Sequence, residues 1–426
     1  MFKPNFTKTM KDIQWSFISL AVTSFSHLLL RIVLGKELGP TGLGIYTLVF
    51  TIYMFGMQFA AFGIGAALTK YVAQYSDEQE KIKEFVSSGI IASLVSGSAI
   101  SILLYSLSST ISIQLFHNPE MTELLKLTAF CIPFIAIQKS VIGTLNGLRK
   151  MKSYAVVNIV QNVSIMLISI ILVLFLDMNV RGAIVGFVIP TILIGTISLI
   201  FVKNYLTTKQ ALIKTVLKEV SIFGFYVVLA NSIGIINTQI DSILIGHFMN
   251  STDVGYYAVA VIFMSGITLL PQATQRVTTA AIAKYYAEND LESVREVIKG
   301  TMKKTFLLTI IITLFFALFG KNLIEIIFTE EFIPAYAPLL ILTIGYAIYA
   351  TFVSVGSCLS SIGKVEIVFK ISAVCAVMNT LLNIALIPKY GLIGAASATT
   401  ASLLFTTLIN LYFIKRYTYE KNIMGI

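Results

Sequence analysis

The sequence predicts an all-α integral membrane protein with twelve transmembrane helices in two parallel six-helix halves. Its composition is the first reason: of 426 residues, 56% are hydrophobic and only 12% are charged, which is too little charge to cover a soluble protein of this size. The second reason is a series of apolar runs about twenty residues long, the length that crosses a hydrocarbon core. The third is an internal repeat of about half the chain.

The repeat is visible in matching glycines and their neighbours. Residues 42–54 read GLGIYTLVFTIYM, and residues 253–264 read DVGYYAVAVIFM. Gly44 matches Gly255 at an offset of 211 residues, and Gly182 matches Gly394 at an offset of 212. An even number of crossings per half returns the second half in the same sense, so the two halves are predicted to be parallel. Duplicated halves are typical of transporters that move one half against the other around a site between them.

The first half is predicted to occupy residues 1–203. It opens with the basic residues Lys3, Lys8 and Lys11, and its sixth run ends just before Lys203. Its expected helices cover 13–35, 43–67, 87–115, 124–146, 154–176 and 182–202.

A connector at 204–218 is predicted to lie on the cytoplasmic surface and to be helical, because it is lysine-rich and lacks Gly and Pro. The second half, 219–426, has six further runs. Its expected helices cover 219–246, 254–276, 303–328, 335–361, 366–387 and 393–414.

The basic residues predict the orientation. With the N-terminus inside, nearly all loop Lys and Arg residues fall on the inner side. The exceptions, on the outer side, are Lys36, Lys126, Arg181, Lys321 and Lys389. Both termini are therefore expected in the cytoplasm. The same asymmetry accounts for the net charge of +10 by topology, without a nucleic-acid partner.

The sequence gives no indication of an enzyme. The phosphate-binding pattern GxxxxGK followed by Ser or Thr is absent, so ATP hydrolysis by this chain is not expected. There is no nucleophile–base pair and no cluster with metal-ligand spacing. We therefore expect no catalytic residue, no metal and no resident cofactor.

Charged residues inside the runs are the candidates for function, since a charge at mid-membrane costs about 3 kcal/mol or more. They are Arg31, Lys139, Arg276 and Asp241. Their polar neighbours recur at helical spacing and form stripes. The stripes are Ser24, His27 and Arg31; Lys139, Gly143 and Asn146; Asn237 and Asp241; and Ser265, Thr268, Gln272, Arg276 and Thr279. They predict a polar path between the halves with three cations and one anion.

Each candidate also has a purely structural interpretation. Arg31 and Arg276 lie near helix ends, where their side chains could reach the lipid headgroups, and Lys139 could do the same from greater depth. A lone His27 is more often a packed, hydrogen-bonded residue. Asp241 lies one position from the repeat counterpart of Arg31, so these two could form a structural ion pair. Ser and Thr also serve as helix-packing residues in membranes.

Longer stretches of the chain resemble a known group. They are GPTGLGIYTLVF, NGLRKMKSYAVVN, QIDSILIGHFMNSTDVGYYAVA, SSIGKVEIVFK and NIALIPKYGLIGAASA. The chain resembles the multidrug/oligosaccharidyl-lipid/polysaccharide (MOP) exporter superfamily over nearly its whole length, and within it the Wzx-type flippases of O-antigen and capsule repeat units. The resemblance implies a V-shaped, MATE-like fold with a central cationic cavity, in the bacterial cytoplasmic membrane.

The cargo implied by the resemblance is an oligosaccharide on undecaprenyl diphosphate, moved from the inner to the outer leaflet. Arg31, Lys139 and Arg276 are the residues that could supply the cationic lumen, with His27 and Gln272 beside them. Asp241 and Asn237 are assigned to a gate or to ion coupling. H⁺, Na⁺ or the membrane potential could drive transport. Membrane lipid and the polysaccharide polymerase machinery are further expected partners.

Several alternatives stay open. A multidrug and toxin extruder of the same superfamily shares this topology, but it binds cations and should show acids in its cavity. A peptidoglycan-precursor flippase would use the same chemistry, although fourteen helices would favour it. A major-facilitator transporter is disfavoured by the loop after helix 2, YVAQYSDEQEKIKE, which lacks the usual motif of that class. A non-transporting scaffold for polysaccharide assembly is disfavoured by the charges inside the runs.

Overall fold

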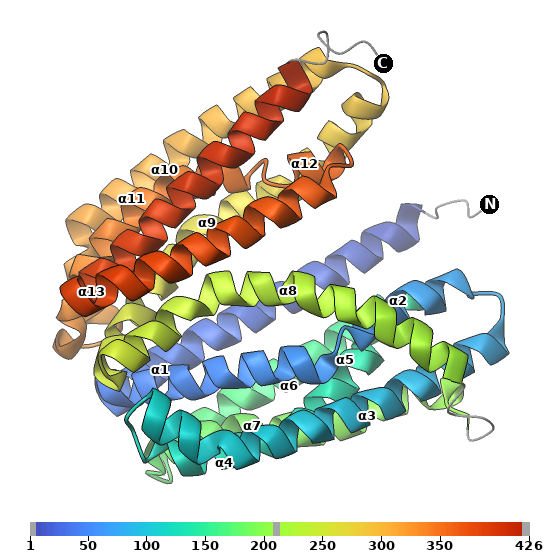
Figure 1. Ribbon diagram of the computed structural model, residues 1–426, viewed down its shortest axis with the longest axis horizontal. Coiled ribbons are helices and arrows are strands. Elements are labelled where there is room, and N and C mark those ends of the chain that lie inside the picture. Colours follow the sequence, from blue (N-terminus) through green and yellow to red (C-terminus); the bar gives the residue numbers. More distant parts are fainter. Residues whose placement is uncertain (1–5, 208–213, 420–426) are drawn as a thin grey trace. The chain divides into compact units, whose positions relative to one another are not determined.

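The computed structural model describes residues 6–207 and 214–419, and these ranges contain helices and no strands (Figure 1). The chain divides into two compact units, Met1–Ile235 and Ile236–Ile426. Residues 208–213 of the predicted connector lie outside the described residues. Before it, Leu206 is extended after the short 3₁₀ helix Ser198–Tyr205, and after it α8 has begun by Lys214.

The first unit contains pairs of helices that are consecutive in the chain and pairs that are distant in it. α1 packs along α6, α6 against α7, and α5 against both α2 and α3. The helices are α1 (Phe6–Ala61), α2 (Ile64–Gln74), α3 (Gln79–Ser109), α4 (Met121–Ala129), α5 (Ile132–Gly147), α6 (Met151–Leu174), α7 (Asn179–Ile197) and the first part of α8 (Lys214–Phe248). A π-helical turn, Thr110–Leu115, extends α3.

The second unit contains the end of α8 and five further α-helices. In it α11 packs against α13, α10 and α9. The helices are α9 (Ser251–Ala287), α10 (Leu291–Ile327), α11 (Tyr336–Val353), α12 (Cys358–Ser361) and α13 (Val365–Tyr419), with a 3₁₀ turn at Glu330–Ala335.

The twelve predicted crossings are accounted for. Within the described ranges, nine helices are long and apolar enough to span a membrane, and α4 with α5, bent by 43°, makes a tenth span. Two of the nine are too long for one crossing, because 52 and 54 residues at 1.5 Å each extend about 80 Å across a core of about 30 Å. Each is interrupted at a glycine with positive φ, Gly39 and Gly391, where the chain turns back (Figure 1).

The repeat is also visible in the backbone. Asn179 and Gly391, which are 212 positions apart, both have positive φ (48° and 56°). Just after them, Gly182 and Gly394 allow close backbone contact with the preceding helix. A Cβ at Gly182 would lie 3.1 Å from the carbonyl oxygen of Leu172, and a Cβ at Gly394 would overlap that of Leu386. The same tight return therefore joins α6 to α7 and the first part of α13 to its second part.

The exterior of the spans is apolar. Ile102 on α3 is 68% exposed, and Leu307 and Leu318 on α10 are 65% and 72% exposed. In water such side chains would form a large unfavourable patch, whereas in a bilayer they contact acyl chains. Polar and charged side chains within these apolar spans are therefore exceptions that require a structural or functional explanation.

Candidate functional site

A polar cluster in the first unit contains the predicted residues His27 and Arg31. Both side chains are half-buried and lie one turn apart on α1. The His27 ring packs edge-on against Phe50, with ring centres 6.0 Å apart, and it lies beside Asn162 of α6. Arg31 lies beside Tyr46. The structure thus brings these two predicted residues together, on the face of α1 that packs along α6.

Lys139 is held elsewhere in the same unit by a close helix contact. Its side chain is half-buried on α5 and has no hydrogen bond or ion pair to any described residue. A Cβ at Gly65 of α2 would lie 2.5 Å from the carbonyl oxygen of Lys139, and a Cβ at Gly143 would overlap the backbone of Gly65. The Thr69 hydroxyl also donates a hydrogen bond to the carbonyl oxygen of Gly143, at 2.9 Å. Because Gly65 and Gly143 let α2 and α5 pack backbone to backbone, they determine where Lys139 lies.

Next to Lys139, the side chain of Gln138 is completely buried and belongs to a neutral network. Its Nε2 donates to Oε1 of Gln161 on α6 at 2.6 Å, and Nε2 of Gln161 lies 3.4 Å from the Thr191 hydroxyl on α7. This network ties α5, α6 and α7 together without any charge. The sequence reasoning did not single out these residues.

Asp241 is the centre of a buried hydrogen-bond network in the second unit. Its side chain is on α8 and only 7% of the residue is exposed. The Tyr257 hydroxyl of α9 and the Thr399 hydroxyl of α13 both donate to Oδ2, at 2.8 and 2.6 Å. Nδ2 of Asn383, also on α13, donates to Oδ1 at 2.7 Å. Three neutral donors from two helices therefore hold this carboxylate.

One hydrogen-bond acceptor beside Asp241 has no partner among the described residues. Oδ1 of Asn383 is buried and has no hydrogen-bond partner among the described residues. Burying an acceptor without a partner costs roughly 1–3 kcal/mol, so such a group usually has a function or a ligand. The Asp241 carboxylate, the side-chain amides of Asn379 and Asn383, and the hydroxyls of Tyr257 and Thr399 thus make up one buried polar network.

The remaining predicted residues lie outside this network. Nδ2 of Asn237 faces the carbonyl oxygen of Ser372 on α13, at 3.4 Å, rather than the Asp241 carboxylate. On α9, Arg276 and Gln272 are exposed, and Nε2 of Gln272 lies 3.4 Å from the Thr268 hydroxyl. The predicted stripe on α9 is thus present as one face of a helix.

Ion pairs do not compensate the membrane charges. Among the described residues the ion pairs are Lys81–Glu78, Lys83–Glu80, Lys126–Glu123 and Arg149–Asp12, all near helix ends. Arg31, Lys139 and Arg276 have no carboxylate partner among them. The cations in the spans therefore have no counter-charge among the described residues.

Sequence reasoning missed three residues of the Asp241 network: Tyr257, Asn383 and Thr399. A signal for Tyr257 was present, because Tyr46 occupies the matching position of the first half at an offset of 211. The other two are 142 and 158 residues from Asp241, and nothing in their local sequence indicates the contact.

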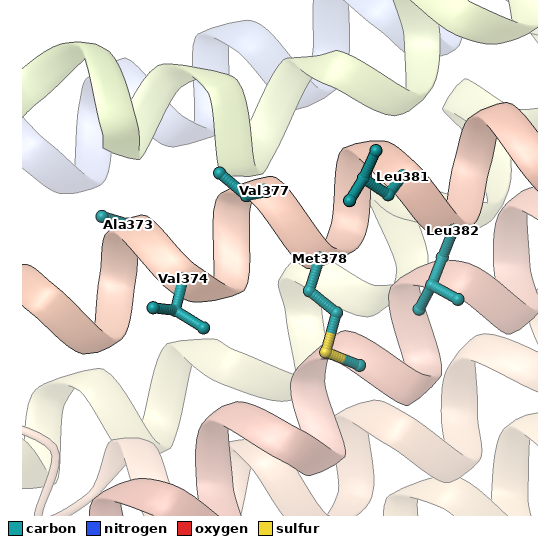
Figure 2. Close-up of a pocket in the computed structure, with 6 residues that line it drawn as sticks. All are labelled: Ala373, Val374, Val377, Met378, Leu381 and Leu382. Atoms are coloured by element: carbon teal, nitrogen blue, oxygen red, sulfur yellow. The ribbon is translucent and has the colours of Figure 1, made fainter.

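A separate cavity of about 570 Å³ lies against α13 and is purely apolar in its side chains. Figure 2 shows its residues along one stretch of that helix: Ala373, Val374, Val377, Met378, Leu381 and Leu382. Asn379 and Asn383 interrupt this sequence but are buried, so α13 is apolar on the cavity side and polar toward Asp241. The cavity suits hydrocarbon and offers nothing to a polar group.

Twelve crossings in two related halves, with uncompensated cations inside the spans, define a polytopic membrane transporter. Residues 9–272 match the family model described as polysaccharide biosynthesis protein, and residues 227–385 match the MatE model. Since the first match covers more than half of the chain, this protein belongs to the polysaccharide biosynthesis protein family, within the MOP exporter superfamily.

Known relatives agree with this assignment. A Shigella flexneri protein named as an O-antigen transporter is 20% identical over 94% of this chain and 96% of its own length. Among solved structures, the lipid II flippase MurJ in an inward closed conformation is similar at a TM-score of 0.77, with 21% identity over 95% of this chain and 87% of that one. An inward-facing multidrug resistance MATE transporter gives 0.71, with 14% identity over 95% and 99%. The two structural likenesses establish the fold.

Proposed function

We propose that this protein is a flippase for undecaprenyl-diphosphate-linked oligosaccharides. It moves each repeat unit from the cytoplasmic to the outer leaflet of the bacterial cytoplasmic membrane for O-antigen or capsule assembly. The observation that carries this proposal is the charge balance inside the spans. Arg31 and Lys139 lack any carboxylate partner in the described ranges, whereas Asp241 is held by neutral donors. Unpaired cations in a membrane protein favour an anionic ligand.

The chemistry of the cations fits a diphosphate. A diphosphate head cannot be left bare in lipid, because burying an isolated charge is prohibitive. The guanidinium of Arg31 offers paired donors that match phosphate oxygens, and the ammonium of Lys139 offers a compact charge. In this proposal the head passes from one cation to the next, Arg276 included, while His27 and Gln272 contribute hydrogen bonds. The lipid tail stays in a hydrocarbon environment such as the apolar side of α13.

The Asp241 network is proposed to couple transport to H⁺ or Na⁺. Its carboxylate, hydroxyl and amide oxygens, which include an unpartnered Asn383 Oδ1, are ligands that hard cations prefer, and a buried carboxylate can also take up a proton. Asn237, on the same helix, would transmit the change to α13 through its contact with Ser372. The membrane potential adds about 2.3 kcal/mol per charge per 100 mV for an anion that moves outward.

The proposal is tested with the purified chain in liposomes and a fluorescent undecaprenyl-diphosphate oligosaccharide. We expect wild type to move the label between leaflets and Lys139→Gln to lose this activity. The matched control is Lys126→Gln, because Lys126 already pairs with Glu123 at the surface, and this variant should flip normally. Normal flipping by Lys139→Gln would overturn the cationic path. Transport of an organic cation without lipid movement would instead identify a drug extruder.

A further inference from the structure

A second cavity lies on the surface of the second unit, apart from the residues described so far. It has a volume of about 320 Å³ and lies between α10, α11 and α13. Its walls are largely hydrocarbon: Met302 and Phe306 come from α10, Ile348 from α11 and Leu411 from α13. We call this cavity the α10–α13 notch. Because three helices contribute to it, its shape is fixed by their packing.

The polar atoms of the notch are nearly all engaged. The Thr351 hydroxyl donates to the carbonyl oxygen of Ala347, and the Thr407 hydroxyl donates to that of Leu403, both at 2.9 Å. The remaining polar group in the lining is the ammonium of Lys303. Lys303 is exposed and has no hydrogen bond or ion pair to a described residue. A ligand of the notch should therefore be hydrocarbon along the walls and anionic at one end.

The place of Lys303 along its helix gives the depth of that anionic end. The apolar run of α10 begins at residue 303, so Lys303 lies where a span enters the headgroup region. Phe306 follows one turn further into the span. A ligand in the notch thus has its charge at headgroup level and its hydrocarbon in the acyl layer.

We propose that the α10–α13 notch binds one anionic phospholipid, with an acyl chain against Phe306, Ile348 and Leu411 and the phosphate on Lys303. Basic pockets between transmembrane helices are a recognised way of holding anionic headgroups. Inorganic phosphate would leave the apolar walls bare, and a neutral lipid would leave Lys303 without a counter-charge. This site does not depend on the identity of the cargo.

The headgroup part is tested on the full chain by native mass spectrometry. The protein is equilibrated with equal amounts of phosphatidylglycerol and phosphatidylcholine that carry the same acyl chains. We expect about a fivefold preference for one retained phosphatidylglycerol, since one basic residue near a membrane contributes about 1 kcal/mol toward an anionic lipid. Lys303→Gln should abolish the preference. Lys304→Gln should keep it, because Lys304 is also exposed but does not line the notch.

The acyl part is tested by filling the notch. Leu411→Trp should prevent retention of either lipid, whereas Leu408→Trp, at a neighbouring position that is 68% exposed and outside the lining, should not. Melting temperatures show whether both variants fold. Lipid retention by Leu411→Trp would overturn the proposal, and so would equal loss of headgroup preference in Lys303→Gln and Lys304→Gln.

Discussion

At the residue scale, the repeat shows that the Asp241 network belongs to the second half alone. Tyr46 and Tyr257 are repeat partners, and each lies beside the membrane charge of its own unit, Arg31 or Asp241. At the same offsets, Asp241, Asn383 and Thr399 correspond to Leu30, Ile171 and Phe187, all apolar. The second half therefore has a carboxylate with an amide and a hydroxyl donor where the first half has three hydrophobic side chains. Packing does not require that replacement, which favours a role in coupling.

The coupling role predicts a specific defect for Asp241→Asn. The amide has the same shape but no charge, so it cannot hold a cation or exchange a proton in the same way. We expect flipping in liposomes to lose its response to an imposed Na⁺ or pH gradient while some gradient-independent movement remains. Wild-type protein without a gradient gives the baseline. An undiminished response in Asp241→Asn would exclude the coupling role.

Arg31 is predicted to bind the cargo rather than to stabilise the fold. Removing a hydrogen bond to a charged group costs about 1.5–3 kcal/mol, so Arg31→Gln should slow flipping roughly 10- to 100-fold. Arg31→Lys keeps the charge but loses the paired donors, and should be intermediate. Initial rates and melting temperatures measured together separate the two roles. A large drop in melting temperature with a normal rate per folded molecule would make Arg31 structural.

The charged candidates could be singled out from the sequence, because a charge inside an apolar run is conspicuous by itself. Their partners are neutral, and neutral polar residues are common in membrane helices. Asn383 and Thr399 become significant only when α13 is placed against α8, through contacts 142 and 158 residues apart. Proximity in the sequence can also mislead. Gln138 is adjacent to Lys139 in the chain, yet its side chain points into a different environment, toward Gln161.

At the element scale, glycines determine where α2 meets α5 and hence where Lys139 lies. We predict that Gly143→Ala destabilises the protein by about 1–3 kcal/mol, because its Cβ would overlap the backbone of Gly65 and force the helices apart. Flipping should fall with it, since Lys139 moves. The matched control is Gly300→Ala on α10, where a Cβ meets nothing within 4 Å. Thermal melting checks both variants, and equal stability of the two would contradict this account.

One predicted span is interrupted in the structure. The expected helix 43–67 is divided in the structure, because Phe62 and Gly63 both have positive φ. Gly63 lies against the backbone of Gly224 in α8, where a Cβ would come within 2.5 Å of the Gly224 carbonyl oxygen. The break thus accompanies a contact with a segment about 160 residues away. Hydrophobicity within a window locates the span, but it carries no information about such a contact.

At the scale of the whole molecule, the count of twelve depends on recognising two hairpins. Apolar length alone gives nine long helices in the described ranges. Two of these nine each contain two spans, separated at Gly39 and Gly391, and the bent pair α4–α5 is not counted among the nine. The sequence placed both turns correctly, since the apolar runs stop at 35 and 387 and resume at 43 and 393. An even number of crossings in each half predicts parallel halves.

Parallel halves predict that repeat-related loops face the same side of the membrane. Ser76 and Glu288, 212 positions apart, are exposed in the loops after α2 and α9 and should both be cytoplasmic, whereas Lys36 and Lys389 should both be external. The native cysteines Cys131, Cys358 and Cys375 are buried and give little background. We expect a membrane-impermeant maleimide to label Lys36→Cys and Lys389→Cys in intact cells, and Ser76→Cys and Glu288→Cys only after permeabilisation. Opposite labelling of Ser76→Cys and Glu288→Cys would mean antiparallel halves, and with them a different route for the cargo. Inversion of all four would preserve the parallel fold but reverse the basic-side assignment on which outward export of an anion depends.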